Sequence, residues 1–516
     1  MSSFAAASGA DTIVSGPGAD TFAFTTPDTV FLAQGADTVF GGSGADTVVV
    51  AAGATAAAWG EARPLFVNAG QGTATVVAGA GGGAFYGGTS GNNLLVGGAT
   101  PATLVGGGPG DVIDGGTGSL IVTGPGAEAV ALGGADSLYA ANAATDSDAV
   151  TEADGTGSLI TLGAGDATLS ALDGARVYGG SGTATITGTA MQVWGGSGNL
   201  AVTVDGSASG AAPSASTVSG GNGSLTVWGG AGGDVLAGGL GGNNLIEPGA
   251  PDETVFGGGN GDQIRLQGSV VQNELIVAGA GAEAISFVPA VGGPTGPGPA
   301  DTIYGGSGAD NVLLGGASEL FAGGGGAASI EIWAGADTVI GGGGSLSVSD
   351  FGTVPSILVG ATAGGNQISN WNAASTLIGG GNADTLTSFF GGNALLIAGP
   401  GHEELADDGP VGGHPVFIAG TGNDTLVGQS PLSAGGPAPT DTFLFARGHA
   451  GGEDLIVHFT GADTVMLSGY SAQGVTTALA DQFLGPKGNI NVQLDDGTRI
   501  VFYGLKHIAG GAFVVT

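Results

Sequence analysis

Residues 35–50 have the sequence GADTVFGGSGADTVVV, in which the segment GADTV occurs twice, nine residues apart. Glycine accepts backbone angles that other residues avoid, so Gly-Gly-Ser-Gly predicts a tight turn. Thr-Val-Val is β-prone, and the alternation of a strand points Val48 to one side and its two neighbours to the other. Such a short strand needs neighbours, so the segment predicts a turn-and-strand unit that stacks on similar units.

The acidic residues keep this spacing outside the opening stretch. The first five aspartates are separated by 9, 8, 9 and 9 residues, and they are Asp11, Asp20, Asp28, Asp37 and Asp46. A doubled period of 18 residues holds later, at Glu283, Asp301, Glu319 and Asp337. We therefore predict an all-β fold, a right-handed parallel β-roll or β-solenoid with two strands and two turns in each coil of about 18 residues. Asp37 is expected in one row with Asp20, and Asp46 in a second row with Asp28 and Asp11.

The composition is strongly acidic and rich in glycine. Of 516 residues, 113 are Gly and none is Cys. The chain has 43 Asp plus Glu but only seven Lys plus Arg, which gives a net charge of −36. Apolar residues make up 42% of the chain, which is enough to supply a core. The charge argues against nucleic acid, whose phosphates require clustered Lys and Arg. It also argues against an anionic membrane surface, so cations are the expected partners.

The sequence gives no sign of membrane insertion or of an N-terminal export signal. No run of 18 apolar residues is present, so no transmembrane helix is expected. Residues 1–9 lack a basic region followed by an apolar core, so no cleavable signal peptide is expected. The protein either stays inside the cell or leaves by a route that does not use the N-terminus.

Several segments match a known nine-residue repeat. GGSGADTVV from Gly41, GGAGGDVLA from Gly229 and GGSGADNVL from Gly305 are full matches, and SGPGADTFA, GGGNADTLT and AGTGNDTLV are near matches. They resemble the glycine-rich calcium-binding repeats of the RTX family, G-G-x-G-x-D-x-U-x, where U is a large apolar residue. The resemblance implies that Asp carboxylates and carbonyls of stacked turns enclose several Ca²⁺ ions, which prefer hard oxygen ligands. The implied ligands are Asp11, Asp20, Asp28, Asp37, Asp46, Asp234, Asp301, Asp310, Asp337, Asp384 and Asp424.

Other repeats keep the turn but lose the carboxylate. Ala184, Leu200 and Leu225 stand at the Asp position of their units and offer no side-chain oxygen. We therefore expect calcium in the N-terminal block and in scattered later turns, with a metal-poor middle at about residues 155–228. For any single Asp, an ordinary role in a turn remains the alternative.

The chain is expected to form a solenoid over residues 1–440 and a different module over 441–516. Loop insertions are expected where the repeat fails, at residues 51–72, 205–216, 286–300, 350–375, 400–415 and 429–440. The C-terminal segment carries four of the seven basic residues, and it predicts a helix at 476–484 and a hairpin turning at Asp496 and Gly497. It resembles the module that ends many RTX proteins secreted by the type I route. The resemblance implies an uncleaved C-terminal signal read by type I secretion machinery, and the segment would also supply a β-rich cap.

The sequence offers little support for catalysis. HEELA from His402 places Ala406 where a zinc protease motif requires its second His, and neither G-x-S-x-G nor a P-loop is present. We therefore expect no enzyme. Aromatic residues directly before a glycine pair should point outward, as a lateral interface, a sugar-stacking platform or a packing surface for a loop. These are Phe40, Tyr86, Tyr178, Trp194, Trp228, Phe256 and Tyr304, of which Tyr178, Trp194 and Trp228 are expected on one face.

Taken together, the sequence predicts a secreted calcium-binding structural protein at the cell surface or outside the cell. It would fold on extracellular Ca²⁺ and assemble as a homo-oligomer or homopolymer into a surface layer, filament or matrix. The alternative is a carbohydrate-active enzyme or glycan-binding adhesin on the same scaffold, with a cell-surface glycan as its partner. A passive calcium buffer is the third hypothesis.

Overall fold

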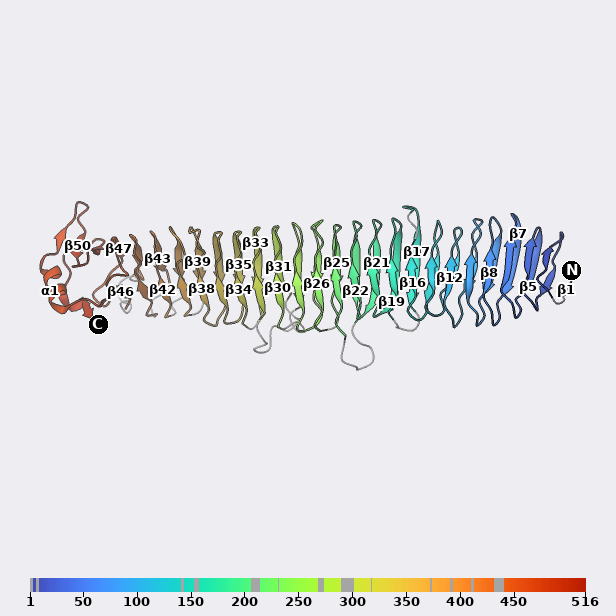
Figure 1. Cartoon of the computed structure of the whole chain (residues 1–516). Helices are drawn as coiled ribbons and strands as arrows, with labels where there is room; N and C mark the ends of the chain where they lie inside the picture. Colours follow the sequence, from blue (N-terminus) through green and yellow to red (C-terminus); the bar gives the residue numbers. More distant parts are fainter. Residues whose placement is uncertain are drawn as a thin grey trace. The chain divides into compact units, whose positions relative to one another are not determined.

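The computed structural model describes residues 3–5, 9–140, 143–152, 157–205, 214–230, 232–267, 273–288, 301–316, 318–371, 374–389, 393–409, 413–430 and 440–516. The fold is an all-β parallel β-solenoid of about 22 turns with roughly 19 residues per turn, which confirms the predicted fold class. The chain divides into two compact units, Met1–Ala250 and Pro251–Thr516. Figure 1 shows the strands of each unit following one another coil by coil.

In the first unit, the odd-numbered strands pair in parallel to form one sheet. They are β1 (Ser3–Ala5), β3 (Thr21–Ala23), β5 (Gly35–Phe40), β7 (Ala54–Trp59), β9 (Thr73–Val77), β11 (Leu94–Val96), β13 (Val112–Asp114), β15 (Ala129–Leu132), β17 (Ser147–Glu152), β19 (Asp166–Asp173), β21 (Ala184–Thr189), β23 (Leu200–Val204), β25 (Leu225–Trp228) and β27 (Leu245–Glu247).

The even-numbered strands of the first unit form a second parallel sheet. They are β2 (Thr12–Val14), β4 (Thr29–Leu32), β6 (Asp46–Val50), β8 (Leu65–Asn68), β10 (Gly83–Tyr86), β12 (Ala102–Val105), β14 (Leu120–Val122), β16 (Ser137–Tyr139), β18 (Leu159–Thr161), β20 (Arg176–Tyr178), β22 (Gln192–Trp194), β24 (Thr217–Ser219) and β26 (Val235–Ala237).

The second unit repeats this arrangement. Its odd-numbered parallel strands are β29 (Gln263–Gln267), β31 (Glu283–Val288), β33 (Asp310–Leu314), β35 (Ala328–Ile332), β37 (Leu346–Asp350), β39 (Gln367–Asn370), β41 (Thr385–Ser388), β43 (Glu404–Asp407), β45 (Thr425–Val427), β47 (Glu453–Val457) and β51 (Arg499–Phe502).

Its even-numbered parallel strands are β28 (Thr254–Phe256), β30 (Leu275–Val277), β32 (Thr302–Tyr304), β34 (Leu320–Ala322), β36 (Thr338–Ile340), β38 (Ile357–Val359), β40 (Thr376–Ile378), β42 (Leu395–Ile397), β44 (Val416–Ile418), β46 (Thr442–Ala446), β48 (Thr464–Ser468) and β52 (Phe513–Val515).

The core of each unit is narrow because most strands contribute one large inward residue. Val39 of β5 and Val48 of β6 are both fully buried, as the alternation within the repeat predicts. In the second unit, Phe321, Val339 and Leu358 are fully buried at equivalent positions of successive even-numbered strands.

Close stacking of the turns explains the glycine content. A Cβ added at Gly422 would lie 1.3 Å from the carbonyl oxygen of Gly401 in the preceding coil, and one at Gly326 would lie 1.5 Å from that of Gly308. No side chain fits at such distances, so successive turns approach closely only where glycine is present.

Three of the expected loop insertions are wrong. Residues 51–72 contain β7 and β8, residues 350–375 contain β38 and β39, and residues 400–415 contain β43. These strands lack the repeat motif but still place apolar residues inward, since Ala56 of β7, Leu358 of β38 and Leu405 of β43 are fully buried. The other three segments, 205–216, 286–300 and 429–440, lie largely outside the described residues.

The C-terminal segment contains the expected helix and hairpin. Helix α1 (Ala472–Ala480) begins and ends four residues before the predicted bounds, and the last two residues predicted as helix form strand β49 (Phe483–Leu484) instead. Strand β50 (Ile490–Gln493) pairs antiparallel with β49 and with β51. The turn lies at Asp496 and Gly497, whose φ of 98° suits glycine. A short 3₁₀ helix, η1 (Gly510–Ala512), precedes β52. The boundary at residue 440 remains a prediction, and parallel pairing continues past it through β46, β47 and β48. Within the described part of the chain, no helix has the length and apolar character to cross a bilayer.

Candidate functional site

The acidic residues of the repeat point into the solenoid. In the repeat D-x-U, the Asp lies two residues before the large apolar residue, and residues two apart share one face of a strand. Asp46 therefore faces inward together with Val48, and both are almost completely buried. Each strand has an inward position two residues before its central buried residue. In the odd-numbered strands we call these positions the odd row, and in the even-numbered strands we call them the even row.

Asp384 shows how the backbone receives such a carboxylate. Its Oδ1 accepts hydrogen bonds from the backbone N–H and the side-chain amide of Asn366 in the preceding coil, both at 2.8 Å. Its Oδ2 accepts from the N–H groups of Gly380 and Gly381 in its own turn, at 2.7 and 3.1 Å. The carboxylate thus closes its own turn and joins it to the coil before it.

The same arrangement recurs through both units. Asp46 accepts from the N–H of Asp28 and of Gly42, and Asp28 in turn accepts from the N–H of Asp11. Asp37 accepts from the N–H of Asp20 in the odd row. The first five aspartates therefore lie in two separate rows, as the 18-residue spacing predicts.

All eleven predicted metal ligands occupy row positions. The even row holds Asp11, Asp28, Asp46, Asp234, Asp301 and Asp337, and the odd row holds Asp20, Asp37, Asp310, Asp384 and Asp424. Asp11 is exposed and the other ten are buried. Their service as calcium ligands remains a prediction.

One inference from spacing alone is wrong. Glu283 and Asp301 are 18 residues apart, but Glu283 stacks on Asp310 in the odd row, whereas Asp301 stacks on Glu319 in the even row. The chain between β31 and β32 is longer than in a regular coil, so an 18-residue step there leads to the other sheet.

Several buried acids in the two rows were missed because they are glutamates or lie outside a full repeat. They are Asp111, Glu128, Asp136, Asp148, Glu253, Asp262, Glu274, Glu283, Glu319, Glu403, Asp441, Asp454 and Asp463. Asp463 follows the sequence Gly-Ala and precedes Thr-Val, as Asp37 does, so the repeat itself could have identified it. Glu128 and Glu403 could have been identified if the repeat had been allowed a glutamate two residues before the inward apolar residue.

Stacking places like charges near one another in a buried environment. Neighbouring parallel strands are about 4.8 Å apart, so consecutive carboxylates in a row are close. Burial, aided by Asp111 and Asp148, raises the pKa of Glu128 to about 8. Burial and the neighbouring Asp337 raise the pKa of Glu319 to about 9, and burial also raises the pKa of Asp337. The ionised rows are therefore unfavourable unless a proton or a cation compensates their charge.

The donor chemistry of the rows fits a hard cation. Asp37 Oδ2, Asp310 Oδ1 and Asp337 Oδ2 are buried and accept no hydrogen bond from the protein. Ca²⁺ takes six to eight oxygen ligands, including carboxylates and backbone carbonyls. Within the described residues, no three Asp, Glu, His or Cys side chains converge as a metal-binding group. A bound ion would therefore use turn carbonyls in addition to row carboxylates.

In the middle of the first unit, apolar residues replace row carboxylates among the described residues, and a metal-poor middle remains a prediction. Ala184, Leu200 and Leu225 occupy the odd row and are buried. Among the described residues from 157 to 228, the buried polar side chains are those of Ser158 and Ser216, and none is acidic.

Outward aromatic residues lie on both sheets. Tyr178 and Trp194 stack in the even sheet with ring centroids 4.9 Å apart, but Trp228 belongs to the odd sheet, so these three residues do not share one face. Phe40, Tyr86, Tyr178, Trp228, Phe256 and Tyr304 are exposed, and Trp194 is half-buried. In the second unit, a continuous stack follows the ends of the odd-numbered strands, formed by Trp333, Phe351, Trp371 and Phe389.

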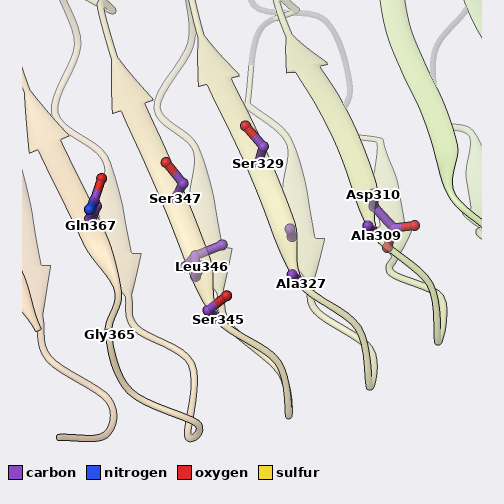
Figure 2. Close-up of a pocket in the computed structure, with 10 residues that line it drawn as sticks. Ala309, Asp310, Ala327, Ser329, Ser345, Leu346, Ser347, Gly365 and Gln367 are labelled. Carbon is purple, nitrogen blue, oxygen red and sulfur yellow. The ribbon is translucent and has the colours of Figure 1, made fainter. Parts of the chain in front are cut away.

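A hydroxyl-rich groove lies beside this aromatic stack. Figure 2 shows Ser329, Ser347 and Gln367 side by side on β35, β37 and β39, over an open hollow of about 350 Å³. An adjoining hollow of about 260 Å³ is lined by Ser369 and Thr387 and reaches Trp371 and Phe389.

Comparison with known proteins does not assign this site. No family model, no curated protein and no solved structure matches the chain.

Proposed function

We propose that this chain is a secreted calcium-binding structural protein that folds on extracellular Ca²⁺ and self-assembles into a surface layer, filament or matrix. The observation that carries the proposal is the stacking of buried carboxylates in two rows. Their charge opposes folding of the metal-free chain at neutral pH, so a cation that binds only the folded state would stabilise it. Export by the type I route rests on the resemblance of the C-terminal segment alone.

In this proposal the row carboxylates hold the ions together with turn carbonyls. Consecutive acids, such as Asp301, Glu319 and Asp337, bring several negative charges together in one row. Bound Ca²⁺ would neutralise the rows and join successive coils. A cytosol low in Ca²⁺ would leave the acidic chain less folded and suited to export.

Isothermal titration calorimetry of chelator-treated protein with Ca²⁺ tests the binding. We expect several sites and a rise in β-sheet circular dichroism during the same titration. Asp310→Asn with Asp337→Asn should reduce the number of sites. Asp114→Asn, a change at an exposed carboxylate, is the matched control. Absence of heat and of any spectral change would refute the proposal.

A second candidate function is binding of a neutral glycan, as an adhesin or as part of a carbohydrate-active enzyme. The observation that favours it is the groove of Ser, Thr and Gln side chains that ends at Trp371 and Phe389. Hydroxyl and amide groups can pair with sugar hydroxyls, and aromatic rings pack on the apolar faces of sugars. Titration with neutral oligosaccharides should quench tryptophan fluorescence, and Gln367→Ala with Thr387→Ala should remove the effect. A signal that is unchanged across a panel of neutral glycans would exclude this candidate.

A further inference from the structure

The outer face of the even sheet in the second unit carries a continuous row of apolar side chains. At the second outward position of each strand, a continuous row runs from Phe256 of β28 to Met466 of β48. We call it the apolar row. Its central members are Ala322, Ile340, Val359, Ile378, Ile397 and Ile418, each paired in register with the next.

The apolar row is accessible to solvent. Tyr304 is 46% exposed and Ile340 is 44% exposed, while Ile378 and Ile397 are half-buried by their neighbours. The first outward position of the same strands carries Thr, Leu, Ile or Val, as at Thr338 and Ile357. None of the outward side chains on the eleven even-numbered strands from β28 to β48 is charged.

The outer face of the odd sheet in the same unit is different. Its outward positions carry mainly Ser, Thr and Gln, including Ser349 and Thr387, together with charged residues such as Glu331 and Glu404. Because both sheets share one core, the contrast does not follow from packing inside the solenoid. It indicates that the even face meets a surface other than water.

The size of the face suits a protein partner. Eleven strands about 4.8 Å apart make a strip about 50 Å long, and a width of about 10 Å gives roughly 500 Å². Two such faces in contact would remove about 1,000 Å² in total, which reaches the lower limit for a specific interface.

Charge and shape favour a second copy of the chain as the partner. A chain with a net charge of −36 repels its own copies wherever acidic groups meet, and this strip is free of charge. Two copies also present the same spacing between side-chain rows, so one row can pack into the grooves of the other at the usual distance of about 10 Å between sheets.

We propose that the apolar row is a self-association surface through which two copies pack even sheet against even sheet in a two-fold arrangement. The inference rests on the proposed function for its setting, because it names the surface that assembly would use. It does not require Ca²⁺ at the interface, since the row contains no oxygen ligands suited to a metal.

The test measures mass in solution by light scattering coupled to size-exclusion chromatography, with Ca²⁺ and with chelator. Ile340→Asp with Ile397→Asp places two charges on the apolar row. Ser349→Asp with Thr387→Asp places the same charges at half-buried outward positions of the odd face. We expect the wild type and the odd-face variant to form dimers or larger species, and the even-face variant to be monomeric with unchanged circular dichroism.

A second even-face variant tests whether a loss of association could come from misfolding of the Asp variant. Ile340→Thr with Ile397→Thr keeps residues that favour strands and copies the neighbouring Thr338, so it should fold and should weaken association at least tenfold. A monomeric wild type at high concentration, or unchanged association of both even-face variants, would overturn the inference. Binding of neutral lipid vesicles by a monomeric wild type would also overturn it, in favour of a membrane.

The outcomes separate the inference from the proposed function. If the chain associates through the apolar row to the same extent in Ca²⁺ and in chelator, the proposed self-association surface is upheld and the proposed role of calcium is refuted. If folding depends on Ca²⁺ but substitutions in the apolar row leave association unchanged, the proposed function is upheld and the proposed self-association surface is refuted.

Discussion

At the scale of single residues, the aspartate of each repeat has a structural task that its position in the sequence already implies. Asp384 accepts four hydrogen bonds, three of them from backbone N–H groups. It does so because it shares the inward face of its strand with Leu386. Buried N–H groups without acceptors are costly, so the carboxylate stabilises the turn whether or not a metal is bound.

Asp384→Ala should therefore destabilise the protein even in chelator. We expect a loss of about 3 kcal/mol in the free energy of unfolding, because three backbone donors lose their acceptor. Urea unfolding followed by circular dichroism measures it. Asp114→Ala removes an exposed carboxylate that accepts a single bond from Gly116, and should change stability by less than about 0.5 kcal/mol. Equal effects of the two changes would contradict the account.

Glycine stacking gives a second prediction for single residues. Gly422→Ala should destabilise the second unit by about 3 kcal/mol, because its Cβ would overlap the carbonyl oxygen of Gly401. Gly461 is the matched control, since a Cβ there would meet no atom within 4 Å. Thermal unfolding should show a lower Tm for the first variant and an unchanged Tm for the second. A normal Tm for Gly422→Ala would mean that the turns are less closely stacked.

At the scale of strands and rows, periodicity predicted much of the fold, and its failures have identifiable causes. The repeat predicted parallel strands, the inward Val39 and Val48, and two rows for the first five aspartates. It failed where small residues replace the motif, as with Ala56 in β7, and where an irregular coil shifts the sheet, as between Glu283 and Asp301. The inward direction of the carboxylates was available from the D-x-U spacing. The apolar row was not, because it depends on strand pairs up to 27 residues apart in sequence.

The rows predict an unusual dependence of stability on pH in chelator. The pKa values of Glu128 and Asp454 are each raised to about 8, mainly by burial. Below about pH 4 these groups are protonated in both the folded and the unfolded chain. As the pH rises, the unfolded chain ionises first, so the free energy of unfolding should fall until about pH 8 and then level off.

Urea unfolding at pH 5.0 and 8.5 measures this difference. Glu128→Gln should reduce the difference, because it removes one group that holds a proton only in the folded chain. Asp114→Asn is again the control. Greater stability at pH 8.5 than at pH 5.0 without calcium would contradict the electrostatic account.

At the scale of the whole molecule, the structure combines an acidic interior with an uncharged outer strip. Carboxylates that most proteins place at the surface here line the inside of both units, in stacked rows interrupted by Ala, Leu, Ser and Asn. The even face of the second unit correspondingly lacks charge and is free to pack against another copy. Folding would thus depend on the buried carboxylates of the odd and even rows, and assembly would depend on the apolar row of the outer face.

The most direct test of the central claim is the circular dichroism of chelator-treated protein at pH 7.5 before and after addition of millimolar Ca²⁺. Neutralisation of the rows predicts a gain of β-sheet signal and a more compact and more stable particle with Ca²⁺, and the reversal of these changes when chelator is restored. Equal strand content and equal size in both conditions would contradict the claim that a cation is needed to balance the buried carboxylates.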